Sequence, residues 1–402
     1  MWVRVISLAV AACCLAMLSL LSLAGEGNAA KEVPRLVREP SAGDWVVDRF
    51  VGNTTGGAIF LQGPAIEAGG VGRSTSLAVA PDGRVFLPVP GNGGIAQVSP
   101  DGMMRLVVSG LEWRADGMDD LYGRGGLLAW NPKENCLYFW GKSCIRRLIQ
   151  KPDGSHSVEV VVGSPNKAGL DDGPAGKATL ASVGNICINS RGEVFFYDGK
   201  RYGHCLRKLE DGAVSTITSM LRTGKHVDGP LEKARFNFIN LGGLNSIGET
   251  DDILYLADHW NFVVRRIDLK AGQVTTVAGI RRPKKGEPRP ARLGKHADGP
   301  ALTHTGFASG CTFAVYDPFH KALWCGGPDE IRLRWMKDGE VRTVMGAKKG
   351  KWDLDGMGNP ADTVKMTWTW VLAVDRQGSA YVMNGASKTG YWRLYNKKEV
   401  GR

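Results

Sequence analysis

Short runs of β-branched and aromatic residues, bounded by glycine, asparagine and aspartate, recur along most of the chain. Representative runs are Arg84–Leu87, Glu193–Tyr197 and Ile253–Leu256. Apolar runs of this length between turn-forming residues predict β-strands, whereas the apolar period of an amphipathic helix is almost absent. The pattern therefore predicts an all-β protein with many tight turns, in agreement with its 54 glycines.

One type of strand, ending in glycine or serine, is repeated at a roughly constant interval. Its clearest copies are Met104–Gly110, Val158–Gly163, Val214–Ser219, Val274–Gly279 and Val341–Gly346. An Asp-Gly pair follows each copy, beginning at Asp116, Asp172, Asp228, Asp298 and Asp355. Two markers with one period indicate a repeated supersecondary unit.

Each period divides into four strands, most clearly at residues 242–249, 253–258, 262–269 and 273–278. Repeated four-stranded antiparallel units are typical of the blades of a β-propeller. The last unit contains only three strands and ends at 391–395, while 46–51 at the other end of the chain aligns with the missing fourth. The sequence therefore predicts an all-β, six-bladed β-propeller with four-stranded antiparallel blades. The N-terminal strand completes the C-terminal blade and removes two open sheet edges.

The repeats resemble a known family. Asp228-Gly229-Pro230, then Leu254–Asp258, Val264–Ile267 and Val274–Gly279, is similar to one complete NHL repeat, and weaker copies cover nearly all of residues 45–397. An arginine recurs in the third strand, at Arg146, Arg207, Arg265, Arg332 and Arg393. The family includes extracellular lyases that need zinc and calcium, RNA-binding domains and exported proteins of unassigned role. The resemblance thus implies the fold and leaves the function open.

The N-terminus carries a targeting signal. An apolar run over 5–24 follows Arg4, and small residues surround Ala29. This predicts a secretory signal peptide over 1–29, with an uncleaved anchor or a lipobox-like cut before Cys13 as alternatives. We expect a linker over 30–44, the propeller over 45–402, no membrane span after cleavage, and a secreted or periplasmic protein.

The chain has 51 lysines and arginines against 40 acidic residues, a net charge of +11. Much of the excess lies in one inserted loop, residues 280–296, which contains Arg281, Arg282, Lys284 and Lys285. A basic loop favours a polyanionic ligand such as an acidic polysaccharide; the alternative is a solvated loop that confers solubility. Export, and the lack of interleaved aromatic residues, argue against nucleic acid as a partner.

In a propeller, the loops from the fourth strand to the next blade share a face with the second-to-third-strand loops, at the channel mouth. Tryptophans beside carboxylates and amides on this face suit stacking on sugar rings, unless they wedge between blades. The candidate ligand-binding residues are Trp113, Asp198, Arg201, Tyr202, His226, His259, Trp260, Arg281, Arg282, Lys284, Lys285, His296 and Trp352.

Two His-x-Asp units, His226 to Asp228 and His296 to Asp298, occupy equivalent loops, and His259 lies on the same face. Imidazoles and carboxylates together could hold a divalent metal or act as an acid–base pair. The alternative is that the aspartates are structural and cap their own turns.

We therefore predict a non-catalytic binding or scaffolding protein, a monomer without a cofactor, that engages an anionic or carbohydrate ligand. The alternative is a metal-assisted hydrolase or lyase, lactonase-like or amidating-lyase-like, with a divalent metal in the channel.

Six cysteines follow the signal segment. Cys136 and Cys144 flank a hairpin expected near Trp140, and Cys311 and Cys325 flank another near Pro318, so both pairs are predicted to form disulfides. Cys187 and Cys205 should lie on strands separated by a third, too far apart for a direct bond. They are expected as free thiols or, alternatively, as one bridge between blades.

Overall fold

The computed structural model describes residues 44–52, 62–68, 76–89, 94–110, 128–141, 143–200, 203–220, 225–237, 243–281, 283, 286–288, 297–307, 310–327, 332–346, 359–365, 369–384 and 390–398. All of these residues except Lys398 belong to one compact unit, Pro40–Lys397. The proposed signal peptide, over 1–29, lies outside the described residues. Within these ranges, no helix is both long and apolar enough to cross a bilayer.

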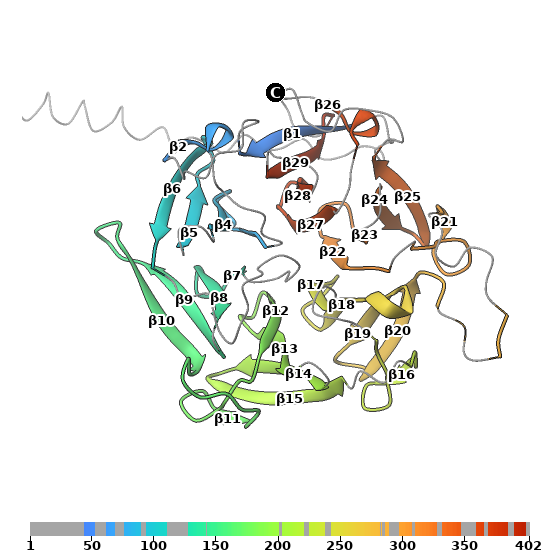
Figure 1. Cartoon of the computed structure of the whole chain (residues 1–402), viewed down its shortest axis with the longest axis horizontal. Helices are drawn as coiled ribbons and strands as arrows, with labels where there is room; N and C mark the ends of the chain where they lie inside the picture. The colour runs from blue at the N-terminus through green and yellow to red at the C-terminus, as the bar shows by residue number, and fades with distance from the viewer. Residues whose placement is uncertain are drawn as a thin grey trace, which may run out of the picture. The chain divides into compact units, whose positions relative to one another are not determined.

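Six antiparallel sheets surround a common centre (Figure 1). Their innermost strands, in the order of blades 1 to 6, are β3 (Ala78–Val79), β7 (Leu128–Asn131), β12 (Val183–Ile188), β17 (Gly243–Ile247), β22 (Phe313–Asp317) and β27 (Thr369–Val374). Each innermost strand contacts the next one, and β27 contacts β3. The ring of contacts is complete, so the protein is a six-bladed β-propeller, as predicted.

The remaining long strands follow outward in each blade. Blade 1 contains β4 (Val85–Val89), β5 (Gly94–Val98) and β6 (Met103–Val108); blade 2 contains β8 (Cys136–Gly141), β9 (Cys144–Gln150) and β10 (His156–Gly163). Blade 3 contains β13 (Val194–Lys200), β14 (Gly203–Glu210) and β15 (Ala213–Met220); blade 4 contains β18 (Ile253–Asp258), β19 (Val263–Asp268) and β20 (Gln273–Ala278). Blade 5 contains β23 (Ala322–Gly326), β24 (Leu333–Lys337) and β25 (Glu340–Met345); blade 6 contains β28 (Ala380–Asn384), β29 (Tyr391–Asn396) and β1 (Trp45–Val51).

In blade 6, the strand from the front of the chain lies beside the last strand of the chain. β1 pairs antiparallel with β29, with Val46 opposite Tyr395 and Asp48 opposite Arg393. The same sheet therefore contains segments separated by more than three hundred residues, and the edge that β29 would otherwise expose is paired.

Five blades carry an additional outer strand of two residues, which the four-stranded prediction did not include. These strands are β2 (Gly63–Pro64), β11 (Gly173–Pro174), β16 (Gly229–Pro230), β21 (Gly299–Pro300) and β26 (Asn359–Pro360). Proline is tolerated there because an edge strand needs no donor on its outer side. In blade 6, Asn359–Pro360 takes the place that the repeat assigned to Asp355-Gly356, which lies outside the described residues.

In blades 3, 4 and 5, the aspartate before the Gly-Pro strand holds that strand to the blade. Asp228 accepts a hydrogen bond from the Thr276 backbone N–H (3.0 Å) and pairs with Arg265 (2.6 Å), and Arg265 also pairs with Asp258 (2.9 Å). The side chains of Arg265 and Asp258 are fully buried. In blade 3 the same positions hold Arg207, Asp198 and Asp172. The aspartates are thus structural, but they bind to the outer long strand of their own blade rather than cap their own turns.

In blade 5 the recurring arginine of the third strand is at a different residue from the one that the sequence predicted. Arg334, and not Arg332, lies opposite the threonine of the outer strand, Thr343, and is fully buried. The Arg334 Nη1 group donates to the carbonyl of Ala297 at 3.0 Å.

Neither predicted disulfide is formed, since all six described cysteines are free thiols. β8 and β9 are joined by a turn directly after Gly141, which pairs with Cys144. Cys136 therefore lies at the far end of the hairpin from Cys144. Burial, followed by the charge of Glu134, raises the pKa of Cys136 to about 12.

The second pair fails for the same reason. Cys325 lies opposite Ala314 in the β22–β23 hairpin, so Cys311 is out of register with it, and the Cys311 thiol donates to the Phe313 carbonyl instead (3.3 Å). Cys187 and Cys205 lie on β12 and β14, which are separated by β13 as expected.

Candidate functional site

The loop face that the sequence proposed as the site is described only in part. The described candidates are Asp198, His226, His259, Trp260 and Arg281. Trp113, Arg201, Tyr202, Arg282, Lys284, Lys285, His296 and Trp352 lie outside the described residues.

Asp198 belongs to the framework rather than to an open loop. Its carboxylate is fully buried and accepts hydrogen bonds from the backbone N–H groups of Ala181 (3.0 Å) and Ser182 (2.7 Å), besides its ion pair with Arg207 (2.8 Å). Burial raises the pKa of Asp198, although these partners oppose the rise. With these bonds made, the carboxylate is not exposed to a ligand.

The two described histidines are also held by protein contacts. His226 Nε2 lies 2.7 Å from the Thr276 hydroxyl, and burial, followed by the charge of Arg265, lowers its pKa to about 4. His259 begins a short 3-10 helix, η4 (His259–Asn261), and is 4% exposed. A Cβ atom at Gly310 of the next blade would lie 2.7 Å from His259 Nδ1, so this ring packs between blades.

No metal site is evident in the part of the chain that the structure describes, where no three His, Cys, Asp or Glu side chains are placed to share an ion. Trp260 is partly buried and meets the His259 ring edge-on at 4.8 Å. Arg281 is 39% exposed and pairs with Glu287 at 2.7 Å.

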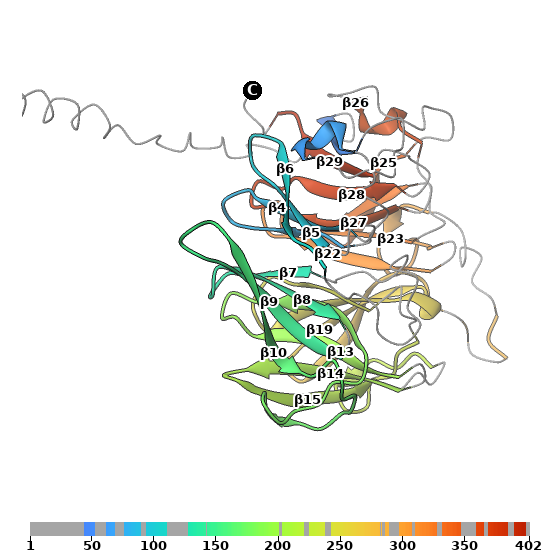
Figure 2. The same ribbon diagram turned by 60° about the vertical axis from the view of Figure 1, so that its left-hand side comes forward.

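A cavity lies at the opposite end of the strands, between blades 1 and 2. It measures about 680 Å³ and is lined by Arg84, Phe86, Trp130, Arg147, Lys151 and His156, among others. We call it the interblade cavity. Its walls include the β7–β8 turn and the β9–β10 turn, and the β9–β10 hairpin extends past its neighbours in the side view (Figure 2).

The floor of the interblade cavity is aromatic and cationic. Phe86 stacks on the partly exposed Trp130 with ring centroids 5.6 Å apart. The Arg84 guanidinium carbon lies 5.5 Å from the centroid of Trp130. Its Nε group donates to Asp82 (2.7 Å) and its Nη1 group to Gln150 Oε1 (3.2 Å). No described residue bonds to Arg84 Nη2.

Several other polar atoms of this cavity also lack partners among the described residues. Trp130 Nε1 and His156 Nε2 are buried without a hydrogen bond, and the exposed Lys151 pairs with no described carboxylate. Burial, followed by the charges of Arg105 and Arg84, lowers the pKa of His156. Buried polar atoms without partners are rare in folded proteins, so a ligand or water that bonds to them would remove an energetic cost.

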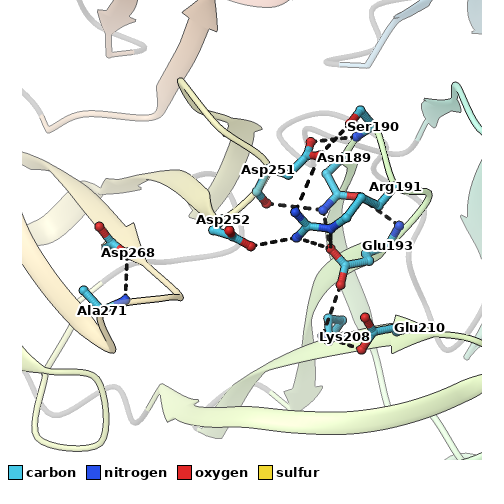
Figure 3. A network of polar contacts seen from close by, with 10 residues as sticks. All are labelled: Asn189, Ser190, Arg191, Glu193, Lys208, Glu210, Asp251, Asp252, Asp268 and Ala271. Carbon is cyan, nitrogen blue, oxygen red and sulfur yellow. Dashed lines mark hydrogen bonds and ion pairs between the residues drawn. The ribbon is translucent and has the colours of Figure 1, made fainter.

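Blades 3 and 4 show how a closed junction looks at the same end of the strands (Figure 3). The Ser190 backbone N–H donates to Asp251 (2.8 Å), and Arg191 pairs with Glu193 (2.6 Å) and with Asp252 (2.7 Å). These contacts tie the first turn of blade 3 to that of blade 4. Between blades 1 and 2 at this end of the strands, the described residues are joined by a hydrogen bond from Arg84 to Gln150 and by the contacts of Arg84 and Phe86 with Trp130, and the cavity lies beside these contacts.

Sequence reasoning missed the interblade cavity because its residues share no motif. Arg84 lies just before β4 in blade 1, whereas Trp130 and His156 lie on β7 and β10 of blade 2, and no spacing between them is repeated elsewhere. Each position taken alone shows only a basic or aromatic residue in or beside a strand, which the packing of an ordinary blade also explains.

Comparisons with known proteins agree with the fold. No protein-family model matches the chain, and no curated protein of similar sequence was found. A solved protein of unknown function from Bacteroides thetaiotaomicron aligns over 87% of this chain and 75% of its own, with 14% identity and a TM-score of 0.56.

Two solved auxiliary nutrient binding proteins are similar to the same extent. The one from Bacteroides thetaiotaomicron covers 87% of this chain and 76% of its own, with 10% identity and a TM-score of 0.55. The one from Bacteroides ovatus has the same coverage, with 9% identity and a TM-score of 0.56. At these identities the likeness shows the fold alone: the chain is a six-bladed β-propeller, and its resemblance to NHL repeats rests on its own sequence.

Proposed function

We propose that the protein is an exported binding protein for an anionic carbohydrate and that the interblade cavity is its ligand site. The observation that carries the proposal is that one cavity combines an aromatic ring with cationic groups, and that these groups have N–H donors without a partner among the described residues. The channel mouth, which the sequence favoured, is the weaker candidate because Asp198, His226 and Arg281 already have protein partners there.

The chemistry of the cavity fits a sugar that carries a carboxylate. Binding sites of this kind are largely apolar, with a few polar groups that fix the orientation of the ligand. The ring of Trp130 offers an apolar surface for one face of a sugar. The guanidinium of Arg84 and the ammonium of Lys151 would bind the carboxylate, and a hydrogen bond to a charged group contributes about 1.5–3 kcal/mol.

The similar propellers support a binding role. Two of them are named auxiliary nutrient binding proteins, so a propeller of this architecture can serve in binding. The predicted signal peptide over 1–29 agrees with a protein that meets carbohydrate outside the cytoplasm.

Calorimetric titration with glucuronate and with glucose tests the proposal. We expect glucuronate to bind and glucose to bind more weakly, because glucose lacks the carboxylate. Arg84→Gln should weaken glucuronate binding about tenfold to a hundredfold, the loss of one charged hydrogen bond.

Arg281→Gln is the matched control, since Arg281 is also a partly exposed arginine in one ion pair but lies on the opposite face. It should leave glucuronate binding unchanged. The proposal is wrong if glucuronate does not bind, or if the Arg84 and Arg281 variants lose affinity equally.

A further inference from the structure

A second cavity, of about 330 Å³, lies between blades 2 and 3 at the same end of the strands. Its walls include Lys133, Tyr138, Val160 and Asp211. Two residues, Glu134 and Arg147, line both this cavity and the interblade cavity. The two cavities are therefore neighbours.

The strands of blade 2 explain how one sheet serves two cavities. Side chains alternate between the two faces of a strand: Leu137 of β8 faces the interblade cavity, and Tyr138, the next residue, faces the second cavity. Packed sheets lie about 10 Å apart, so the two cavities are separated by roughly one sheet. They meet over the β7–β8 turn, where Glu134 is located.

The ridge between the cavities is a surface ion pair. Arg147 pairs with Glu134 at 2.8 Å and with Glu159 at 2.9 Å, and all three side chains are at least 35% exposed. Exposed ion pairs contribute little to stability. A ligand that crosses the ridge can therefore bind to Arg147 without disrupting the fold.

The cavities differ in charge. The interblade cavity has Arg84 and Lys151 in addition to the shared pair, and so favours an anion. In the second cavity Lys133 is balanced by Asp211, and the other walls include the apolar side chains of Val160 and Leu209. It suits an uncharged ring with an apolar substituent.

We infer that the ligand is a linear oligosaccharide that contains both acidic and neutral sugars. The acidic sugar occupies the interblade cavity and a neutral one occupies the second cavity, with the chain passing over Arg147. This inference rests on the proposed function, because it takes the interblade cavity as the site of the acidic sugar.

Hyaluronan oligosaccharides, in which glucuronate alternates with N-acetylglucosamine, are suitable probes. Calorimetric titration with glucuronate and with chains of two, four and eight sugars should show an affinity that rises more than tenfold between glucuronate and the eight-sugar chain. A rise of that size is larger than the statistical gain that arises because a longer chain offers several glucuronate units to the same cavity.

Val160→Asp tests the second cavity by placing a negative charge at a side chain that is 53% exposed. It should weaken binding of the eight-sugar chain about tenfold and leave glucuronate binding unchanged. Leu302→Asp is the control, since Leu302 is an apolar side chain of similar exposure, 55%, in blade 5. It should change neither affinity.

The outcomes separate the two proposals. If glucuronate binds but longer chains bind no more tightly, or if the Val160 and Leu302 variants behave alike, the inference fails and the proposed function stands. If glucuronate does not bind at all, the proposed function fails as well. If poly-glutamate of equal charge binds as tightly as the eight-sugar chain, the ligand is an acidic peptide and not a carbohydrate.

Discussion

The buried arginine of blade 4 provides the strongest test of how the blades are held together. Arg265 and its neighbour Arg266 lie on the same strand, β19, and both form ion pairs. The Arg265 side chain is fully buried, whereas Arg266 is 29% exposed and lies 3.3 Å from Asp268. The same substitution, arginine to methionine, at the two positions therefore compares a buried pair with a surface pair.

The expected cost follows from what remains after each substitution. Without Arg265, Asp258 stays buried and keeps only its hydrogen bonds from Asn237 (2.7 Å) and Asn261 (2.9 Å). Removing one partner of a buried ion pair costs about 3–5 kcal/mol. Removing Arg266 from its surface pair should cost less than about 1 kcal/mol.

Urea unfolding at neutral pH, with linear extrapolation to water, measures both values. The double variant Arg265→Met with Asp258→Leu is expected to be more stable than Arg265→Met alone, because it leaves no unpaired buried carboxylate. If Arg265→Met lowers the free energy of unfolding no more than Arg266→Met does, the buried pair of Arg265 with Asp258 does not stabilise the blade, and this explanation of the recurring arginine is refuted.

Three further predictions concern other parts of the molecule. The pKa of His226 is about 4 in the folded protein, whereas that of an unfolded histidine is about 6.5. Between these two pH values the unfolded state binds one more proton, so the free energy of unfolding should be constant above pH 6.5 and fall by about 1–2 kcal/mol toward pH 4. The variant His226→Gln should remove this pH dependence from urea unfolding curves. Ellman titration of the unfolded, unreduced mature protein should detect six thiols, and a count of two would restore both predicted disulfides. Neutralising the four basic side chains at 281, 282, 284 and 285 should leave retention on an acidic-polysaccharide column unchanged, because the proposed ligand site is the interblade cavity; a loss of retention would instead assign polyanion binding to the basic loop.

The repeat of strands was readable from sequence because strand formation depends on local pattern. The expected strands 253–258 and 273–278 coincide with β18 (Ile253–Asp258) and β20 (Gln273–Ala278), since alternating side chains and flanking turn residues are set within each short segment. Six periods then determine six blades, because each sheet must bury both of its faces against neighbours.

Register and contacts between distant segments were decided only by the tertiary structure. A shift of one or two residues leaves the local pattern almost unchanged but alters every facing pair, which is why Arg332 was chosen in place of Arg334 and why Cys136 and Cys144 do not meet. The Gly-Pro strands and the interblade cavity depend on partners far away in the chain. The sequence by itself therefore determined the kind of fold, and the packing of the blades decided which side chains lie together, because that proximity depends on how separate sheets fit against one another.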